Sequence, residues 1–320
     1  MENRARISDV SPRDGLQNEP LIHDAPVPTA AKVALIEALA RSGVDEVEAA
    51  SFVNPKLVPQ LADAEAVLTE VAARRASRRG EFPVITVLVP NQRGMDNAIR
   101  VRAHCLETLG VPAFDKIALF TAASETFSQR NVNAAIAETF DRFRPVIEVA
   151  RANQIPIRGY VSCAIACPYE GPIAPSRVAE VSASLLDLGG IDELDLGDTI
   201  GVGTPASTRA MLDAVIDKVL NKKPSTTVTL HLHDTFGRAV ECVEAAIDLG
   251  VRSFDGSAGG IGGCPFASTP QRRAPGNIST AVLVRACRAK GLACPVDLDR
   301  LDDAARVALA SAGRGAGANP

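Results

Sequence analysis

The sequence has no tryptophan, and only 4% of its 320 residues are aromatic. A buried core must therefore consist mainly of Ala, Val, Leu and Ile, which are typical of parallel α/β architectures. Hydrophobic residues make up 46% of the chain, which is enough for a large core. The length allows one large barrel or two modest domains.

The sequence also lacks an excess of positive charge, because it has 34 basic and 38 acidic residues and a net charge of −4. This balance argues against nucleic acid or an anionic membrane surface as the main partner. The exception is a cluster of Arg74, Arg75, Arg78 and Arg79. It is typical of a solvated helix end, and a patch for phosphate groups is the alternative.

No apolar run approaches the length of a membrane span, and no apolar signal region precedes the first motif near Asp9. We therefore expect a cytoplasmic protein. The seven cysteines form an odd count without a framework spacing, as in a reducing compartment. Cys163 and Cys167 lie close together, but no second cysteine pair is near enough in the sequence to complete a zinc site.

Eight short β-like runs alternate with amphipathic stretches, several of which begin beside Pro, Ser or Thr and end at Gly. The runs are residues 7–10, 46–52, 84–89, 116–121, 157–162, 193–196, 227–232 and 252–255. The helical stretches include residues 29–42, 59–79, 133–153, 175–188, 205–220 and 238–249. Eight β/α units predict an α/β fold of the (β/α)8 TIM-barrel type. A doubly wound sheet is the alternative, but no glycine fingerprint follows the first run.

Two more helices are predicted after the barrel, at residues 279–290 and 298–312, and the Gly- and Ala-rich end at 313–320 is expected to be disordered. No internal repeat or linker is evident. We therefore predict one domain, with the barrel over 6–280, C-terminal helices packing on it over 281–312, and a tail over 313–320.

His231 and His233 lie two apart at the end of a predicted strand, so both side chains project from one face. Two imidazoles side by side can hold a divalent metal, although two ordinary histidines on a solvated face would show the same spacing. Reactive groups of such barrels lie where strands end. Asp14 after the first strand and Asn277 after the eighth would therefore come close to the histidines. This donor set suits Mg, Mn, Co or Zn.

Arg13 directly precedes Asp14, so its guanidinium would stand close to an oxyanion bound to the metal. A salt bridge to Glu48 or Asp198 is the alternative, and both roles are compatible. Residues 256–265 contain five glycines, which let a backbone approach a ligand closely and let a loop close as a lid. Cys264 in this loop is a candidate acid or base, or else an incidental thiol.

These residues belong to longer motifs, which together resemble the 3-hydroxy-3-methylglutaryl-CoA (HMG-CoA) lyase family of metal-dependent barrels, with a pyruvate carboxyltransferase-type domain. The motifs are DVSPRDGLQNE at 9–19, VEAASFVNPK at 47–56, VSCA at 161–164 with CPYEG at 167–171, LGDTIG at 196–201, HLHDT at 231–235 and GGIGGCPFA at 259–267. The resemblance extends over residues 6–280. Each motif is weak alone, and the set is specific.

The resemblance implies that Mg²⁺ or Mn²⁺ is bound by Asp14, His231, His233 and Asn277. It implies catalytic roles for four residues: Arg13 at the thioester enolate, Cys264 in a proton transfer, and Glu48 and Asp198 in orienting the metal ligands. A substrate-binding role is predicted for Arg13, Ser51, Arg158, Gly262 and Gly263.

The implied reaction is cleavage of HMG-CoA to acetyl-CoA and acetoacetate, as in leucine degradation and ketone body metabolism, by a homodimer. The alternatives are a lyase for citramalyl-CoA or an isoprenoid-extended glutaryl-CoA, and a non-catalytic barrel that binds acyl-CoA. Two departures from the family leave the acyl group open. Asn277 lies thirteen positions after Cys264, which is several more than usual, and Ala281 and Val282 stand where the family tends to have acidic residues.

Overall fold

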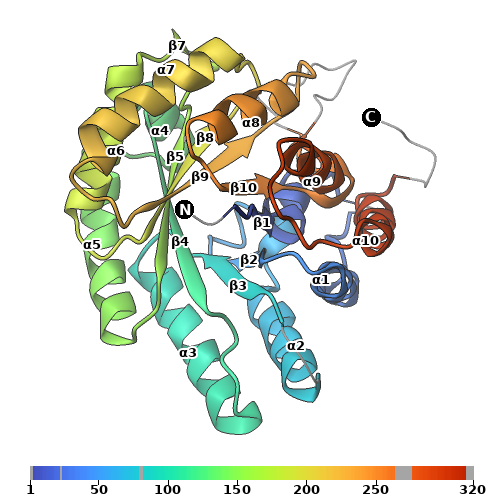
Figure 1. Cartoon of the computed structure of the whole chain (residues 1–320). Coiled ribbons are helices and arrows are strands. Elements are labelled where there is room, and N and C mark those ends of the chain that lie inside the picture. The colour runs from blue at the N-terminus through green and yellow to red at the C-terminus, as the bar shows by residue number, and fades with distance from the viewer. Residues whose placement is uncertain (1–2, 22–23, 79–81, 264–275, 315–320) are drawn as a thin grey trace.

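The computed structural model describes residues 3–21, 24–78, 82–263 and 276–314, and eight parallel strands in it form a closed barrel (Figure 1). Around the barrel the order is β1-β10-β9-β8-β5-β4-β3-β2. The strands are β1 (Arg6–Asp9), β2 (Glu46–Ser51), β3 (Val84–Leu88), β4 (Lys116–Ala122), β5 (Ile157–Ser162), β8 (Glu193–Asp198), β9 (Thr227–Leu232) and β10 (Ser253–Gly256). The predicted TIM barrel is confirmed, and all eight predicted strands are present.

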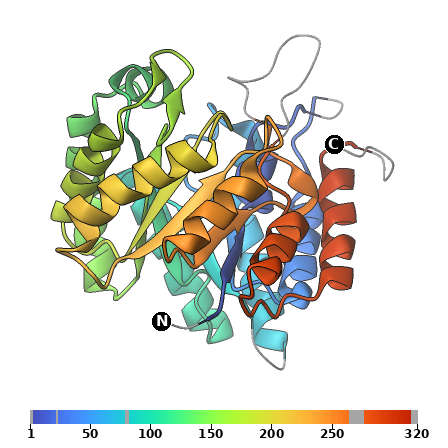
Figure 2. The ribbon, with the colours of Figure 1, turned by 45° about the horizontal axis from the view of Figure 1, so that its top comes forward.

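After β4 the chain first forms a short helix, α4 (Glu125–Val132). Each of the eight strands is followed by a helix of the layer that covers the outside of the barrel (Figure 1). These helices are α1 (Thr29–Ser42), α2 (Ala64–Ser77), α3 (Gln92–Leu109), α5 (Ile136–Ala152), α6 (Pro175–Asp187), α7 (Pro205–Val215), α8 (Ala239–Asp248) and α9 (Thr280–Ala289). Both predicted C-terminal helices form. The first, α9, completes the eighth β/α unit, and α10 (Leu298–Ser311) packs beside α1 (Figure 2).

The helix boundaries differ from the prediction where a turn interrupts the apolar pattern. The stretch 59–79 divides into a 3₁₀ turn, η2 (Pro59–Leu61), and α2, and 205–220 divides into α7 and a π turn, η3 (Ile216–Leu220). The helix predicted over 133–153 begins only at Ile136, because the preceding helix, α4 (Glu125–Val132), ends at Asn133, which is in the left-handed region (φ 49°). None of the described helices is long and apolar enough to cross a membrane.

The arginine cluster lies at the end of α2. Arg75 forms an ion pair of 2.8 Å with Asp115, and Arg74 lies 3.9 Å from Glu37 with its side chain 55% exposed. Arg79 lies outside the described residues. This arrangement favours the interpretation as a solvated helix end.

The barrel has two different buried layers. Between strands and helices the packing is apolar, with Ile7, Val47 and Ile85 fully buried, as the composition predicts. The interior of the barrel is instead charged at the end where the strands begin. Lys116 Nζ lies 2.7 Å from both Glu46 Oε2 and Glu193 Oε2. The composition alone did not predict this charged interior.

Replacing Lys116 tests how much this interior contributes to stability. Lys116→Met should lower the free energy of unfolding by about 3 kcal/mol, because it leaves two buried carboxylates with one fewer cation. Urea denaturation would measure the change. Lys223→Met, which removes an exposed ion pair with Asp187, should cost no more than about 1 kcal/mol. Equal losses in the two variants would contradict this interpretation of the interior.

Candidate metal centre

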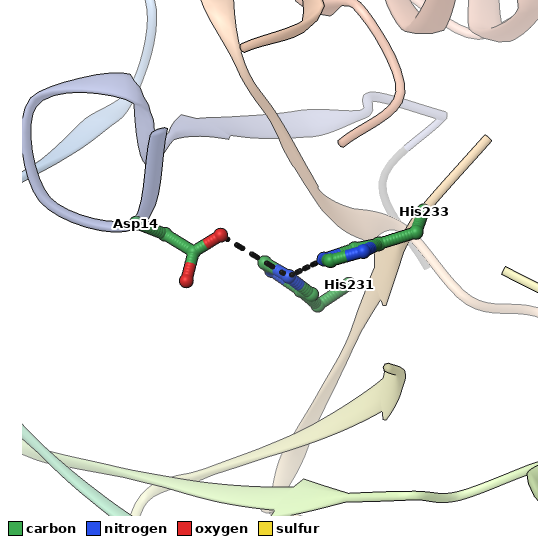
Figure 3. A group of neighbouring side chains, drawn as sticks. All are labelled: Asp14, His231 and His233. Carbon is green, nitrogen blue, oxygen red and sulfur yellow. Dashed lines mark hydrogen bonds and ion pairs between the residues drawn. The ribbon is translucent and has the colours of Figure 1, made fainter. Parts of the chain in front are cut away.

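The two histidines come from the end of β9, and Figure 3 shows their rings side by side. His231 is 9% exposed and His233 is 8% exposed, and their Nε2 atoms lie 3.3 Å apart. The prediction that both side chains share one face is confirmed. The alternative of two histidines on a solvated face is wrong, because both rings are buried.

Asp14 comes from η1 (Ser11–Gly15), a π-helical turn directly after β1. The buried Asp9 carboxylate fixes this turn, because it accepts hydrogen bonds from the Ser11 backbone N–H at 2.9 Å and from Thr280 Oγ1 at 2.6 Å. Asp14 Oδ2 lies 3.9 Å from His231 Nε2, and Figure 3 shows the carboxylate directed at that ring. One ligand atom from each of Asp14, His231 and His233 lies within 4.8 Å of the other two.

Asn277 lies beside this trio. Its Nδ2 donates to Asp14 Oδ2 at 2.9 Å and to the Ile261 carbonyl at 3.2 Å, and its backbone pairs with that of His233. Gly262 adopts φ +100°, and a Cβ there would come within 2.6 Å of Asn277 Nδ2. The glycine is therefore required for the position of Asn277. Substrate contacts of Gly262 and of the buried Gly263 stay predictions.

Arg13 connects the trio to a second carboxylate. Its Nε and Nη2 lie 2.9 and 2.5 Å from Glu48 Oε2, and its Nη1 lies 2.8 Å from Asp14 Oδ1. The predicted salt bridge to Glu48 is confirmed, and the hydrogen bonds found for Asp198 do not involve Arg13. A buried guanidinium thus stands next to a candidate metal ligand, as expected from the sequence.

Two predicted residues on β2 have buried oxygens without a hydrogen-bond partner within the described part of the chain, Glu48 Oε1 and Ser51 Oγ. Burial raises the pKa of Glu48, although Arg13 opposes the shift. A carboxylate with one unpaired oxygen and a raised pKa is suited to exchanging a proton.

Asp198 and Arg158 do not lie beside the three ligands. The Asp198 carboxylate accepts hydrogen bonds from the Gly203 and Val202 backbone N–H groups at 2.7 and 3.3 Å, so it holds the loop after β8. Arg158 is 0% exposed inside the barrel. Its Nη2 lies 2.8 Å from Glu193 Oε1. The predicted substrate contact of Arg158 is not supported by this position. Cys264 lies outside the described residues.

The sequence model of the HMGL-like family matches residues 4–308 of the chain, which is nearly its whole length. The chain belongs to the HMGL-like family. The resemblance inferred from the motifs is therefore confirmed, as is the prediction of a carbon–carbon lyase.

Similarity to individual members of the HMGL-like family extends over nearly the whole chain. Mitochondrial hydroxymethylglutaryl-CoA lyase of Rattus norvegicus is 42% identical over 306 residues, which cover 95% of this chain and 84% of that protein. The crystal structure of the HMG-CoA lyase from Brucella melitensis has a TM-score of 0.82 and 42% identity, covering 97% and 99% of the two chains. An HMG-CoA lyase from Acinetobacter baumannii in complex with coenzyme A and 3-methylmalate has a TM-score of 0.82 and 33% identity, covering 99% and 96%.

The charge states in this HMGL-like chain suit metal binding. Burial disfavours the Asp14 carboxylate, but Arg13 and the two imidazoles outweigh it and lower its pKa to about 2. Burial, reinforced by His231, lowers the pKa of His233 to about 4. At neutral pH the site therefore offers an ionised carboxylate and a neutral imidazole, the forms that coordinate metals. Two nitrogens and one carboxylate, with an amide nearby, fit a divalent cation.

Two further buried residues at this site, Asp255 and Tyr160, were not among the site residues predicted from the sequence. Asp255 Oδ2 lies 3.3 Å from His231 Nδ1 and 3.3 Å from the Tyr160 hydroxyl. The only signal in the sequence is that both are polar residues within strand-like runs.

Proposed function

We propose that this chain cleaves 3-hydroxy-3-methylglutaryl-CoA to acetyl-CoA and acetoacetate at the end of the barrel that carries Asp14, His231 and His233. The observation that supports this most is that these three donors lie beside the Arg13–Glu48 ion pair. The chain in which they do so is 42% identical to the rat lyase. The acyl-CoA substrate is also supported by the coenzyme A in the Acinetobacter structure.

Asp14, His231 and His233 would hold the divalent cation, with Asn277 as a fourth ligand, and we propose Mg²⁺ or Mn²⁺. When bound, the cation supplies a Lewis acid for the hydroxyl and carbonyl oxygens of the substrate.

Two residues of the chain are proposed to transfer protons, Glu48 as the base and Cys264 as the acid. The tertiary hydroxyl loses its proton to a base, for which Glu48 is the candidate because Oε1 is unpaired. The C2–C3 bond then breaks, and its electron pair passes into the thioester enolate of the leaving acetyl-CoA. Arg13 places positive charge where this enolate oxygen forms. Cys264 then gives the enolate carbon its proton.

The test is a panel of thioesters offered to the purified protein with Mg²⁺, namely HMG-CoA, citramalyl-CoA and an isoprenoid-extended glutaryl-CoA. HMG-CoA should release acetyl-CoA with the highest kcat/KM, and EDTA should abolish the release. Higher kcat/KM for another member would reject HMG-CoA as the main substrate. No release from any thioester would reject the lyase proposal as a whole.

Cys264→Ala should lower kcat by about 10²-fold, because a positioned acid or base contributes at least this much. Steady-state release of acetyl-CoA would measure it. Mn²⁺ affinity should stay at the wild-type value, because the cysteine is not proposed as a ligand. Cys105→Ala, which removes a buried thiol from α3, is the matched control and should keep full kcat. An unchanged kcat for Cys264→Ala would make this thiol a bystander.

We also propose a homodimer. Light scattering should then give twice the chain mass of 33.5 kDa, and a monomer mass at assay concentration would contradict it. The cytoplasmic location and a role in leucine degradation and ketone body metabolism stay predictions from the sequence.

A further inference from the structure

The imidazole of His231 contacts a carboxylate on the side away from the other candidate ligands. Its Nε2 lies 3.3 Å from His233, whereas its Nδ1 lies 3.3 Å from Asp255 Oδ2. Asp255 is 2% exposed and stands directly beside His231 in the register of the parallel strands β10 and β9. The contact therefore joins neighbouring positions of two rigid strands.

Asp255 is itself held in place by two side chains from β5. Arg158 Nη1 lies 3.0 and 3.2 Å from Asp255 Oδ1 and Oδ2. The Tyr160 hydroxyl lies 3.3 Å from Asp255 Oδ2 and 3.2 Å from Glu48 Oε2. All of these groups are buried, so water does not compete for the hydrogen bonds.

These contacts form a continuous path from His231, a candidate metal ligand, to the guanidinium of Arg13. It runs from His231 through Asp255 and Tyr160 to Glu48, which holds Arg13. The carboxylate can only accept a hydrogen bond, so it selects the imidazole tautomer with the proton on Nδ1. The lone pair is then on Nε2, which faces Asp14 and His233.

We propose that Asp255 is the positioning residue for His231, fixed in turn by Arg158 and Tyr160, and that it presents Nε2 of His231 for metal binding. The proposal rests on the metal site described above. It gives Arg158 a role through Asp255 in place of the predicted contact with substrate. Carboxylates that accept from the second nitrogen of a ligating histidine generally strengthen metal binding in this way.

The first test is a titration of the purified protein with Mn²⁺ alone, followed by the electron paramagnetic resonance signal of the free ion. Asp255→Asn keeps the size of the side chain but removes its charge, and it should weaken Mn²⁺ binding by about 10- to 100-fold. Glu46→Gln is the matched control. Glu46 also faces Arg158, at 3.0 Å, but the described hydrogen bonds and ion pairs of His231 do not include it.

The control should bind Mn²⁺ as the wild type does. Wild-type affinity in Asp255→Asn would overturn the proposal. An equal loss in both variants would also overturn it, because the effect would then come from general disturbance of the charged interior. Thermal unfolding of each variant in EDTA would show whether the metal-free fold is intact.

A second measurement does not depend on a folded variant. The chain has only four histidines, so ¹⁵N-labelled histidine in the Mg²⁺-loaded wild-type protein gives a nuclear magnetic resonance spectrum that can be assigned. His231 should carry its proton on Nδ1, and a proton on Nε2 would overturn the proposal. Neither measurement uses a thioester. Failure to cleave HMG-CoA would therefore reject the proposed function and leave this inference standing.

Discussion

His233→Ala should lower kcat by about 10³-fold or more. The His233 ring gives Nε2 to the donor set, and its Nδ1 has no hydrogen-bond partner among the residues that the structure describes. We therefore expect His233 to contribute to catalysis through metal binding, and little to the stability of the fold. A Lewis acid supplies several kcal/mol of transition-state stabilisation, and each 1.36 kcal/mol corresponds to a tenfold change in rate.

The measurement is kcat for HMG-CoA cleavage over a range of Mg²⁺ concentrations. If the variant has lost metal affinity, high Mg²⁺ should restore part of the activity. His104→Ala, which removes an exposed histidine from α3, is the matched control and should keep full activity. A His233→Ala variant that turns over at the wild-type rate would show that the ring is not part of the working site.

The strands could be predicted because their sequences carry a strong local signal. The runs Val84–Leu88 and Thr227–Leu232 are rich in β-branched residues, which favour extended backbone. Helix ends were less predictable, because single contacts decide them. Asn91 and Ser124 start α3 and α4 by accepting hydrogen bonds from the Gly94 and Phe127 backbone N–H groups, and neither helix was among the predicted stretches.

The charged interior shows what closure of the barrel adds to the strand pattern. Glu46 and Glu48 alternate with an apolar residue along β2, as Glu193 and Asp195 do along β8. Such alternation is typical of a sheet with one face in water. Only closure converts the polar face into a buried interior, and closure depends on all eight strands together.

The same reason explains which part of the site could be predicted. His231 and His233 are revealed by the period of a single strand, and Asp14 and Asn277 by the rule that reactive groups lie at strand ends. Asp255 could not be placed, because its contact with His231 depends on the register of β10 against β9. Arg158 was given a substrate-binding role for a related reason, because its position inside the barrel follows from the pairing of β5 with β8, which sets Arg158 beside Glu193.

The second large effect is expected at Arg13, whose guanidinium bridges Glu48 and Asp14. Arg13→Met should lower kcat by about 10³-fold, the upper part of the range for losing one group that stabilises an oxyanion. Two causes act together. The enolate loses its cation, and the buried Glu48 loses the partner that opposes the rise of its pKa. A more protonated Glu48 is a poorer base.

Arg13→Lys tests whether the positive charge of Arg13 is sufficient without the planar geometry of its guanidinium. A lysine keeps the charge but cannot bond two carboxylates as a planar fork does, so an intermediate loss of about 10²-fold is expected. Separate values of kcat and KM at saturating Mg²⁺, with the Mn²⁺ affinity of each variant, would measure the effect. Arg209→Met, which removes an exposed ion pair with Asp248 on the outside of the barrel, is the control. If Arg13→Met bound Mn²⁺ normally and kept kcat within tenfold of the wild type, the enolate would be stabilised by other groups.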